Sequence, residues 1–211
     1  MPNYVKNAIT FKTTKGLEKF KKAYMPNGEF SFNSIDEMPA SLDIERSYKS
    51  LFAFEFYASK NNIEGPQPVL TSHQTPEELE KEYSSLSEGE KEYCLKLGEQ
   101  MASNLKEYGY ADWYDWRLSH WGTKWDAMEV WIDEKTHSII FQTAWSAPMS
   151  IIEKIAKKTR SMFTFSYADE DLGQNCGVFL FGGKYGSKGC GMEIGGTPEG
   201  EELARMMWDA E

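Results

Sequence analysis

Apolar and polar residues alternate near the start of the chain with the period of two that half-buried β-strands show. Over residues 4–12 the alternate apolar side chains share one face, so the pattern predicts a strand. Thr13 or Thr14 can cap a following helix. The inward side chains of that helix, at helical spacing, would be Leu17, Phe20 and Tyr24. A second extended piece, Phe30–Ile35, completes a predicted β-α-β opening.

The same alternation returns in the carboxyl-terminal half. It predicts five strands, at Met128–Ile132, Ser138–Trp145, Phe163–Tyr167, Val178–Phe181 and Met192–Ile194. A helix with Ser146 as its cap and Pro148 in its first turn should separate the second strand from the third. A closing helix is expected over Thr197–Trp208. We expect the two ends of the chain to form one split α+β sheet with the helices on one face.

Between these ends, residues of about 40–109 follow a helical pattern. Thr75 and Glu78 have the spacing of a capping box, and Ser87 and Glu90 repeat it. A long amphipathic helix should follow and stop at Gly109. Residues 51–57 fit either state, because their phenylalanines alternate while their flanks suit a helix, and residues 61–74 are expected to be a loop. The prediction is a single domain, 1–211, with this helical insert.

Residues 110–126 stand out, because they hold four of the chain's 7 tryptophans. As a helix, the segment would place one set of residues on a single face: Tyr110, Trp113, Tyr114, Arg117 and Trp121. The opposite face would hold Asp112, Asp115 and Ser119, and Gly122 would end the helix. An aromatic stripe at helical spacing is usually core packing. Buried Arg117 would need stacking and an anionic partner, either Asp126, Asp112 or a later acidic residue, or a ligand.

Composition restricts the partners. The chain has 23 Lys and Arg against 33 Asp and Glu, a net charge of −10, which disfavours binding to duplex nucleic acid. Its 3 cysteines form no metal-binding or disulfide spacing, which favours a reducing compartment. No apolar run reaches membrane-spanning length, and the first residues lack a signal-peptide pattern. We therefore expect a cytoplasmic protein without a membrane partner.

Several motifs resemble those of one family. They are Trp113-Tyr-Asp-Trp-Arg117, Trp121-Gly-Thr-Lys-Trp-Asp126, Phe141-Gln-Thr-Ala-Trp-Ser-Ala-Pro148, the opening Asn7-Ala-Ile-Thr-Phe11 and the dipeptide Met38-Pro39. On these motifs the chain resembles the Api92-like proteins with a YubB-type ferredoxin-like domain. The resemblance implies a ferredoxin-like split β-α-β antiparallel sheet with a helical insertion. It also implies that the carrier is a phage, plasmid or other mobile element, and it assigns no activity.

No motif identifies an enzyme or a metal site. The Gly-rich segment Gly182–Gly191 lacks the phosphate-loop spacing and lies between strands, so a hairpin loop is the expected structure. The three histidines are too scattered for a metal site. Cations and indoles could still form a pocket for a planar anion. The candidate ligand-binding residues are Trp113, Arg117, His120, Trp121, Lys124, Trp125, Trp145 and Lys184.

Three functional hypotheses remain. The first is a non-enzymatic binding protein of a mobile element, acting in the host cytoplasm as a host-interaction or counter-defence factor that sequesters a small anionic, nucleotide-like ligand. The second is an enzyme with an unrecognised site near the Trp-rich segment, with His120 or Asp126 as base. The third is a protein–protein interaction module that binds a host protein through an acidic surface. No cofactor is expected.

Overall fold

The computed structural model describes residues 3–63, 74–159 and 161–208. Most of the loop predicted over residues 61–74 lies outside these ranges. The chain forms two compact units. The first consists of Met1–Glu37 and Leu118–Glu211, and the second is Met38–Arg117.

The first unit is built on an antiparallel sheet with six strands among the described residues, in the order β2-β3-β1-β4-β5-β6. The strands are β1 (Tyr4–Phe11), β2 (Met128–Asp133), β3 (Ser138–Ala144), β4 (Phe163–Asp169), β5 (Cys176–Phe181) and β6 (Cys190–Glu193). β1 is antiparallel to its neighbours β3 and β4, and β3 is antiparallel to β2. β1 therefore runs parallel to β2, and β3 parallel to β4, with one strand between each pair. The predicted α+β fold with a split β-α-β sheet is confirmed.

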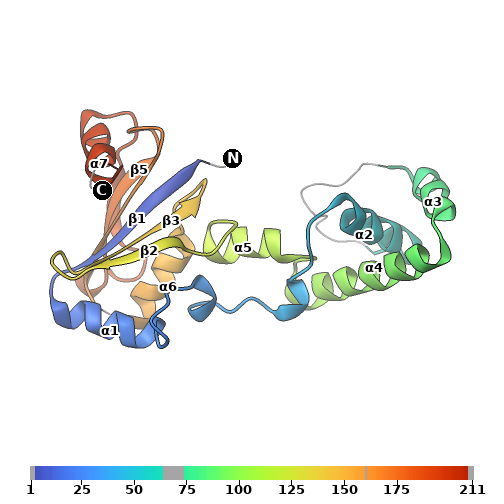
Figure 1. Cartoon of the computed structure of the whole chain (residues 1–211), viewed down its shortest axis with the longest axis horizontal. Helices are drawn as coiled ribbons and strands as arrows, with labels where there is room; N and C mark the ends of the chain where they lie inside the picture. The colour runs from blue at the N-terminus through green and yellow to red at the C-terminus, as the bar shows by residue number, and fades with distance from the viewer. Residues whose placement is uncertain (1–2, 64–73, 160, 209–211) are drawn as a thin grey trace. The chain divides into compact units, whose positions relative to one another are not determined.

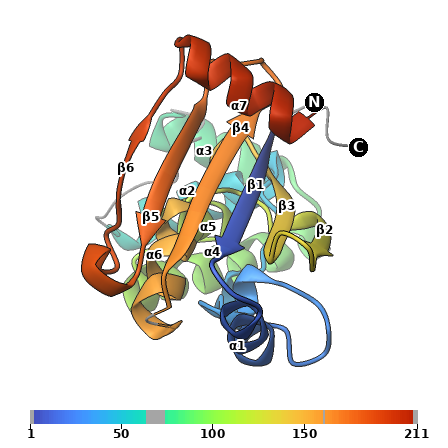
Figure 2. The same ribbon diagram turned by 90° about the vertical axis from the view of Figure 1, so that its left-hand side faces the viewer.

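Helices cover both faces of this sheet. They are α1 (Thr14–Tyr24), α6 (Met149–Thr159) and α7 (Pro198–Trp208). Figures 1 and 2 show α7 on one side of the sheet and α6 on the other. The prediction that the helices share one face is thus wrong for α7. Ala204 of α7 is buried with Ala168 of β4 and Cys176 of β5, which lie on this second face.

One predicted strand is absent from the described sheet. Residues Phe32–Ser34 form a short 3₁₀ turn, η1, in place of the extended piece expected at Phe30–Ile35. The ring centroids of Phe30 and Phe32 lie 5.2 and 5.7 Å from that of Phe141, so both rings point into the core. The Phe32 N–H donates to the Asp126 carboxylate at 2.6 Å, in place of a neighbouring strand's carbonyl. Alternation was misleading here because a side chain supplies the hydrogen bond of a sheet ladder.

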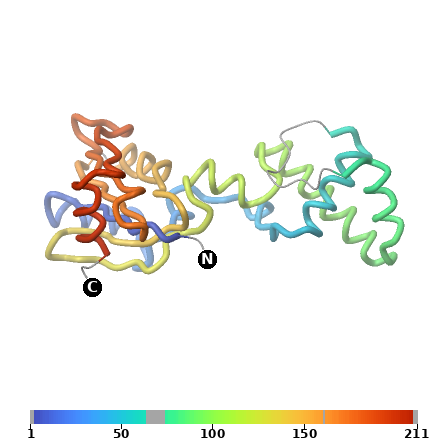
Figure 3. The backbone as a smooth tube through the Cα atoms, turned by 90° about the horizontal axis from the view of Figure 1, so that it is seen from above, coloured from blue at the N-terminus to red at the C-terminus, as the bar shows by residue number. Residues whose placement is uncertain are grey.

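The second unit is helical, as predicted for the insert. After the short turn η2 (Ala40–Leu42), it contains α2 (Tyr48–Asn61), α3 (Pro76–Ser85) and α4 (Glu88–Tyr108), whose path can be followed in Figure 3. Residues 51–57 are helical, with Phe54 in one apolar cluster and Phe52 and Phe56 in another. The Thr75 and Ser87 N–H groups donate to the Glu78 and Glu90 carboxylates at 2.7 and 3.0 Å. Both predicted capping-box contacts are therefore present.

The Trp-rich segment begins its helix later than predicted. α5 spans Trp113–Trp121, and the boundary between the two units falls inside it. Asp112 precedes the helix and accepts a hydrogen bond from the Tyr114 N–H at 2.9 Å, as a capping residue does. Asp112 is fully buried and precedes α5, so the prediction that it lies on the helix face opposite the aromatic residues is wrong. No helix within the described ranges is long and apolar enough to span a bilayer.

Candidate functional site

A lysine held between two indoles is the main polar feature at one end of the sheet. The Lys124 Nζ lies 4.0 Å from the Trp125 ring centroid and 3.6 Å from the Trp145 centroid. Lys124 and Trp125 belong to the connection between α5 and β2, whereas Trp145 directly follows β3. The sequence predicted this association of Lys124 with the two tryptophans. We call these three residues the Lys124 cluster.

Two side-chain hydrogen bonds join the segments that carry the cluster. The Thr123 Oγ1 donates to the Ala144 carbonyl at 2.9 Å, and the Ser146 Oγ donates to the Gly122 carbonyl at 2.6 Å. Ser146 therefore links two loops, which differs from its predicted role as the cap of α6. Thr123 is buried, and these two hydrogen bonds hold Lys124 beside the end of β3.

Trp145 combines exposure with an unusual backbone. Its side chain is 49% exposed, and its φ of 68° lies in the left-handed region that a bulky residue rarely adopts. Two hydrogen bonds fix this conformation. The Trp145 N–H donates to the Asn3 carbonyl at 2.9 Å, and the Asn175 Nδ2 donates to the Trp145 carbonyl at 3.4 Å. Strain of this kind costs about 1–3 kcal/mol and is concentrated at functional sites.

The electrostatics of Lys124 differ from those of a typical surface lysine. Burial lowers the pKa of its ammonium below the usual value. Among the described residues, no carboxylate forms an ion pair with it, although the chain carries a net charge of −10. A cation flanked by two π faces can attract an anion, and the exposed Trp145 ring can stack on a planar group.

The structure places the other predicted site residues elsewhere. In the second unit, the Arg117 Cζ lies 4.9 Å from the Trp113 ring centroid, so the predicted stacking is confirmed. Trp121 is only 1% exposed and donates its indole N–H to the Asp36 carbonyl at 3.0 Å, which makes it a core residue. Lys184 lies over Tyr185 in the turn η3 (Gly183–Tyr185) after β5, at the opposite end of the sheet. Trp121 and Lys184 therefore do not belong to the Lys124 cluster.

His120 belongs to a polar cluster that the sequence did not reveal. Its Nδ1 lies 2.9 Å from the Asp36 Oδ2, and the Lys154 ammonium bonds both to the same oxygen and to the His120 carbonyl. Burial alone would raise the pKa of Asp36, but hydrogen bonds from Lys154 and His120 hold it below its usual value. Asp36 and Lys154 are far from His120 in sequence, and no local spacing links the three. The arrangement joins three segments of the first unit.

The proposed acidic partners are already engaged. Asp112 pairs with Arg46, whose Nε lies 2.8 Å from its Oδ2, and Asp115 pairs with the same guanidinium. The Arg46 Cζ also lies 4.4 Å from the Tyr114 ring centroid. Asp126 accepts hydrogen bonds from the Ser31 hydroxyl and from two backbone N–H groups. Asp126 therefore acts as a structural acceptor, which weakens its assignment as a catalytic base.

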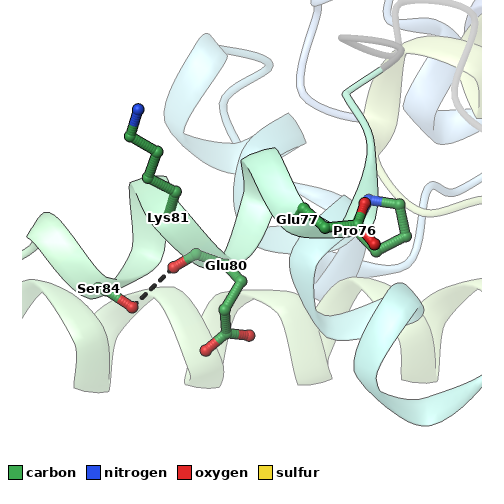
Figure 4. A pocket seen from close by; sticks show the side chains of 5 residues that line it. All are labelled: Pro76, Glu77, Glu80, Lys81 and Ser84. Atoms are coloured by element: carbon green, nitrogen blue, oxygen red, sulfur yellow. Dashed lines mark hydrogen bonds between the residues drawn. The ribbon is translucent and has the colours of Figure 1, made fainter.

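A shallow hollow on α3 offers no competing site. It is lined by Pro76, Glu77, Glu80, Lys81 and Ser84. Figure 4 shows Lys81 pointing away from Glu80, and the Ser84 hydroxyl donates to the Glu80 carbonyl at 2.8 Å. The polar groups do not converge on one point, as binding of a small molecule requires.

Residues 120–211 match the family model described as the ferredoxin-like domain in Api92-like protein. Residues 120–211 therefore form a ferredoxin-like domain of the kind found in Api92-like proteins. The matched stretch includes β2 to α7, and β1 from the start of the chain completes the Api92-like sheet between β3 and β4. The Lys124 cluster lies within the matched residues.

Comparisons of the whole chain add little. No curated protein matches it. Among solved structures, it is similar to the protein Api92 from Yersinia pseudotuberculosis, with 10% sequence identity and a TM-score of 0.42. The similarity covers 94% of this chain and 100% of that chain. At this level, the similarity transfers no residue role to the Api92-like domain described here.

Proposed function

We propose that this protein is a non-enzymatic binding protein whose Lys124 cluster captures a small, planar anion. The observation that carries the proposal is the Lys124 ammonium, which contacts two indoles and has no carboxylate partner among the described residues. An anionic group of the ligand would pair with Lys124, and its planar group would stack on the exposed Trp145 ring.

The energies favour a small ligand of this kind. Each stacked base contributes about 1–3 kcal/mol, and a charge-assisted hydrogen bond adds about 1.5–3 kcal/mol. The net charge of −10 repels long polyanions, so duplex nucleic acid is a poor partner. A nucleotide combines a planar base with a compact anionic group and fits both requirements.

The resemblance suggests a biological setting for this binding. Api92-like proteins are expected on phages, plasmids or other mobile elements. In the host cytoplasm, a protein of this kind could sequester a nucleotide-type signal and act as a counter-defence factor. We propose this role together with the binding activity, and the enzyme hypothesis becomes secondary because Asp126 is occupied by structural hydrogen bonds.

Equilibrium dialysis with mono-, di- and cyclic nucleotides tests the proposal, with inorganic phosphate as the non-planar control. Lys124→Gln should weaken nucleotide binding by at least about tenfold, because it removes the charge but keeps much of the side chain's length. Lys184→Gln is the matched control, since Lys184 also lies over an aromatic ring, at 4.9 Å from the Tyr185 centroid.

Binding that survives Lys124→Gln would contradict the assignment of the site. If neither nucleotides nor phosphate bind the intact protein, the small-ligand proposal is wrong. The protein-interaction hypothesis would then be the one to pursue.

A further inference from the structure

The edge strand β2 lies between two hollows that the proposed nucleotide site does not use. β2 is the terminal strand of the sheet, so the backbone groups on its outer side point away from the other strands. One hollow, of about 450 Å³, is lined by Met25, Gly28, Glu29, Phe30, Val130, Trp131 and Ile132. The other, of about 400 Å³, is lined by Lys6, Ala8, Trp131, Ile132, Asp133, Ile140, Met206 and Met207.

The two hollows lie on opposite faces of the sheet. Phe30, in the first hollow, contacts Phe141 at a centroid separation of 5.2 Å. The second hollow includes Ile140, the neighbour of Phe141 in β3. Consecutive residues of a strand point to opposite faces, so Ile140 and Phe141 mark the two sides. The edge of β2 therefore has a recess on each face of the sheet, and each recess is lined mainly by apolar residues.

This geometry is the one that an added β-strand needs. A peptide paired with β2 would continue the sheet through main-chain hydrogen bonds, and its successive side chains would enter the two recesses alternately. The pairing of β2 with β3 is irregular between Met128 and Trp131, and Glu129 has a φ of 46°. The irregularity confines regular pairing to Trp131–Asp133, and both hollows are lined by residues of this stretch.

Trp131 is the anchor of this edge. It is 38% exposed, and its ring centroid lies 5.3 Å from the Lys6 ammonium. Lys6 is itself only 1% exposed, and its ammonium also lies 4.8 Å from the Trp208 centroid. The Trp131 ring therefore packs against the buried Lys6 side chain on one side and is partly exposed to solvent. Aromatic residues that are partly exposed in this way often contribute most of the binding energy of protein interfaces.

We propose that β2 binds an extended segment of a partner protein that has apolar central residues and basic flanks. The charges near the edge support this choice, because Glu29 and Glu129 are exposed there and Asp133 lies at its end. Glu134 contributes less, since it is already paired with Lys21 at 2.9 Å. The same charges would face each other in a pair of β2 strands from two copies, so self-association is disfavoured. The segment's side chains fill the recesses, and its lysines or arginines meet the carboxylates.

The test uses the whole protein and a labelled probe peptide, acetyl-Lys-Lys-Ile-Val-Leu-Val-Lys-Lys-amide. Two further peptides carry N-methyl groups on one or the other alternating set of the four central residues. In an added strand, only one set of N–H groups faces β2. Fluorescence anisotropy should therefore show that one N-methylated peptide loses at least about tenfold in affinity while the other retains binding.

Variants of the protein locate the site. Trp131→Ala should weaken binding by about tenfold or more, and Glu129→Lys should also weaken it. Met192→Ala and Glu193→Lys are the matched controls, because both residues are exposed on β6, the opposite edge strand. Hydrogen exchange should show slower amide exchange in β2 and no change in β6 when the parent peptide binds.

Several results would overturn the proposal. They are no binding of the parent peptide, equal loss for both N-methylated peptides, or protection of β6 in place of β2. Concentration-dependent dimerisation that Trp131→Ala abolishes would assign the edge to a second copy of the chain and would also contradict the proposal. Nucleotide binding at Lys124 depends on none of these outcomes.

Discussion

At the residue scale, Trp145 links strain to the proposed activity. Its φ of 68° suits glycine, whereas its indole forms one side of the Lys124 cluster. In Trp145→Gly, relief of strain should offset the greater freedom of the unfolded chain, so the free energy of unfolding should change by less than about 1 kcal/mol. Nucleotide binding should be lost. Urea denaturation and dialysis measure the two effects.

His137→Gly provides the control, because His137 also has a positive φ, 57°, and does not belong to the cluster. It should leave binding unchanged. Loss of nucleotide binding in both variants would mean that Trp145→Gly acts by loosening the fold, which would contradict a direct role for the indole.

Arg46 illustrates a different kind of residue, one that holds a buried charge pair. Asp112 is 0% exposed, and among the described side chains its cationic partner is Arg46. Arg46→Met should destabilise the protein by about 3–5 kcal/mol, because it leaves a buried carboxylate without its partner. The double variant with Asp112→Asn should be less destabilised than the two single changes combined. Additive losses in urea denaturation would argue against this coupling.

Asp169 gives a pH dependence with a definite sign. Burial raises its pKa in the folded state above the ordinary value of 3.8, and its Oδ1 accepts no hydrogen bond from the described residues. Ionisation therefore opposes folding. The protonated carboxyl group of Asp169 therefore contributes to the free energy of unfolding. This contribution is complete below pH 3.8 and is lost as the pH rises through the folded-state pKa. Asp169→Asn should remove this loss, because the amide does not ionise.

Unfolding measured in urea at about pH 4 and about pH 7 tests this expectation, since the two values lie near and well above the ordinary pKa of a carboxyl group. The free energy of unfolding of Asp169→Asn, relative to that of the wild type, should be higher at about pH 7 than at about pH 4. The reverse order would mean that the ionised carboxylate stabilises the fold.

At the element scale, apolar periodicity predicted the strands of the sheet, and the sequence also predicted the caps of α1, α3 and α4. The prediction failed for Ser146, and it failed where a side chain replaces the hydrogen bond of a ladder. β1, α1, α4 and the strands from β2 to β6 follow from local apolar spacing and capping residues. The turn at Phe32–Ser34 depends on Asp126, which is 94 residues away from Phe32. The position of α7 depends on its contact with Ala168 and Cys176, which pairing of β4 with β5 brings together. Neither contact has a local signal.

The close packing of α2 against α4 requires a glycine at position 98. A Cβ at Gly98 would lie 2.4 Å from the Ala53 carbonyl oxygen and 2.5 Å from the Tyr57 Cβ. Gly98→Ala should therefore destabilise the second unit by about 1–3 kcal/mol, although alanine is the better helix former. Thermal unfolding measures the loss.

Gly89→Ala is the control in the same helix, since a Cβ at Gly89 would meet no atom within 4 Å. This change should be neutral or stabilising by up to about 1 kcal/mol. If both substitutions stabilise the protein, the close contact between α2 and α4 is not formed.

At the scale of the whole molecule, the sequence identified part of the candidate site. Lys124 and Trp125 are adjacent in sequence, and the predicted hairpin brings the end of β3, and so Trp145, back to them. The sequence alone could not exclude Trp121 from the candidate site. Its burial depends on contact with Phe32, whose ring centroid lies 5.9 Å from that of Trp121. The partners of His120 and Asp112 were also hidden, since Asp36 and Arg46 come from distant segments.

The most direct test of the account follows the tryptophan indole N–H signals by NMR during a nucleotide titration. We predict that the signals of Trp125 and Trp145 shift together and saturate, because both rings contact Lys124. The Trp121 signal should stay in place, since its indole is buried and bonded to Asp36. Saturable shifts confined to Trp131, or none at Trp125 and Trp145, would contradict a ligand site at the Lys124 cluster.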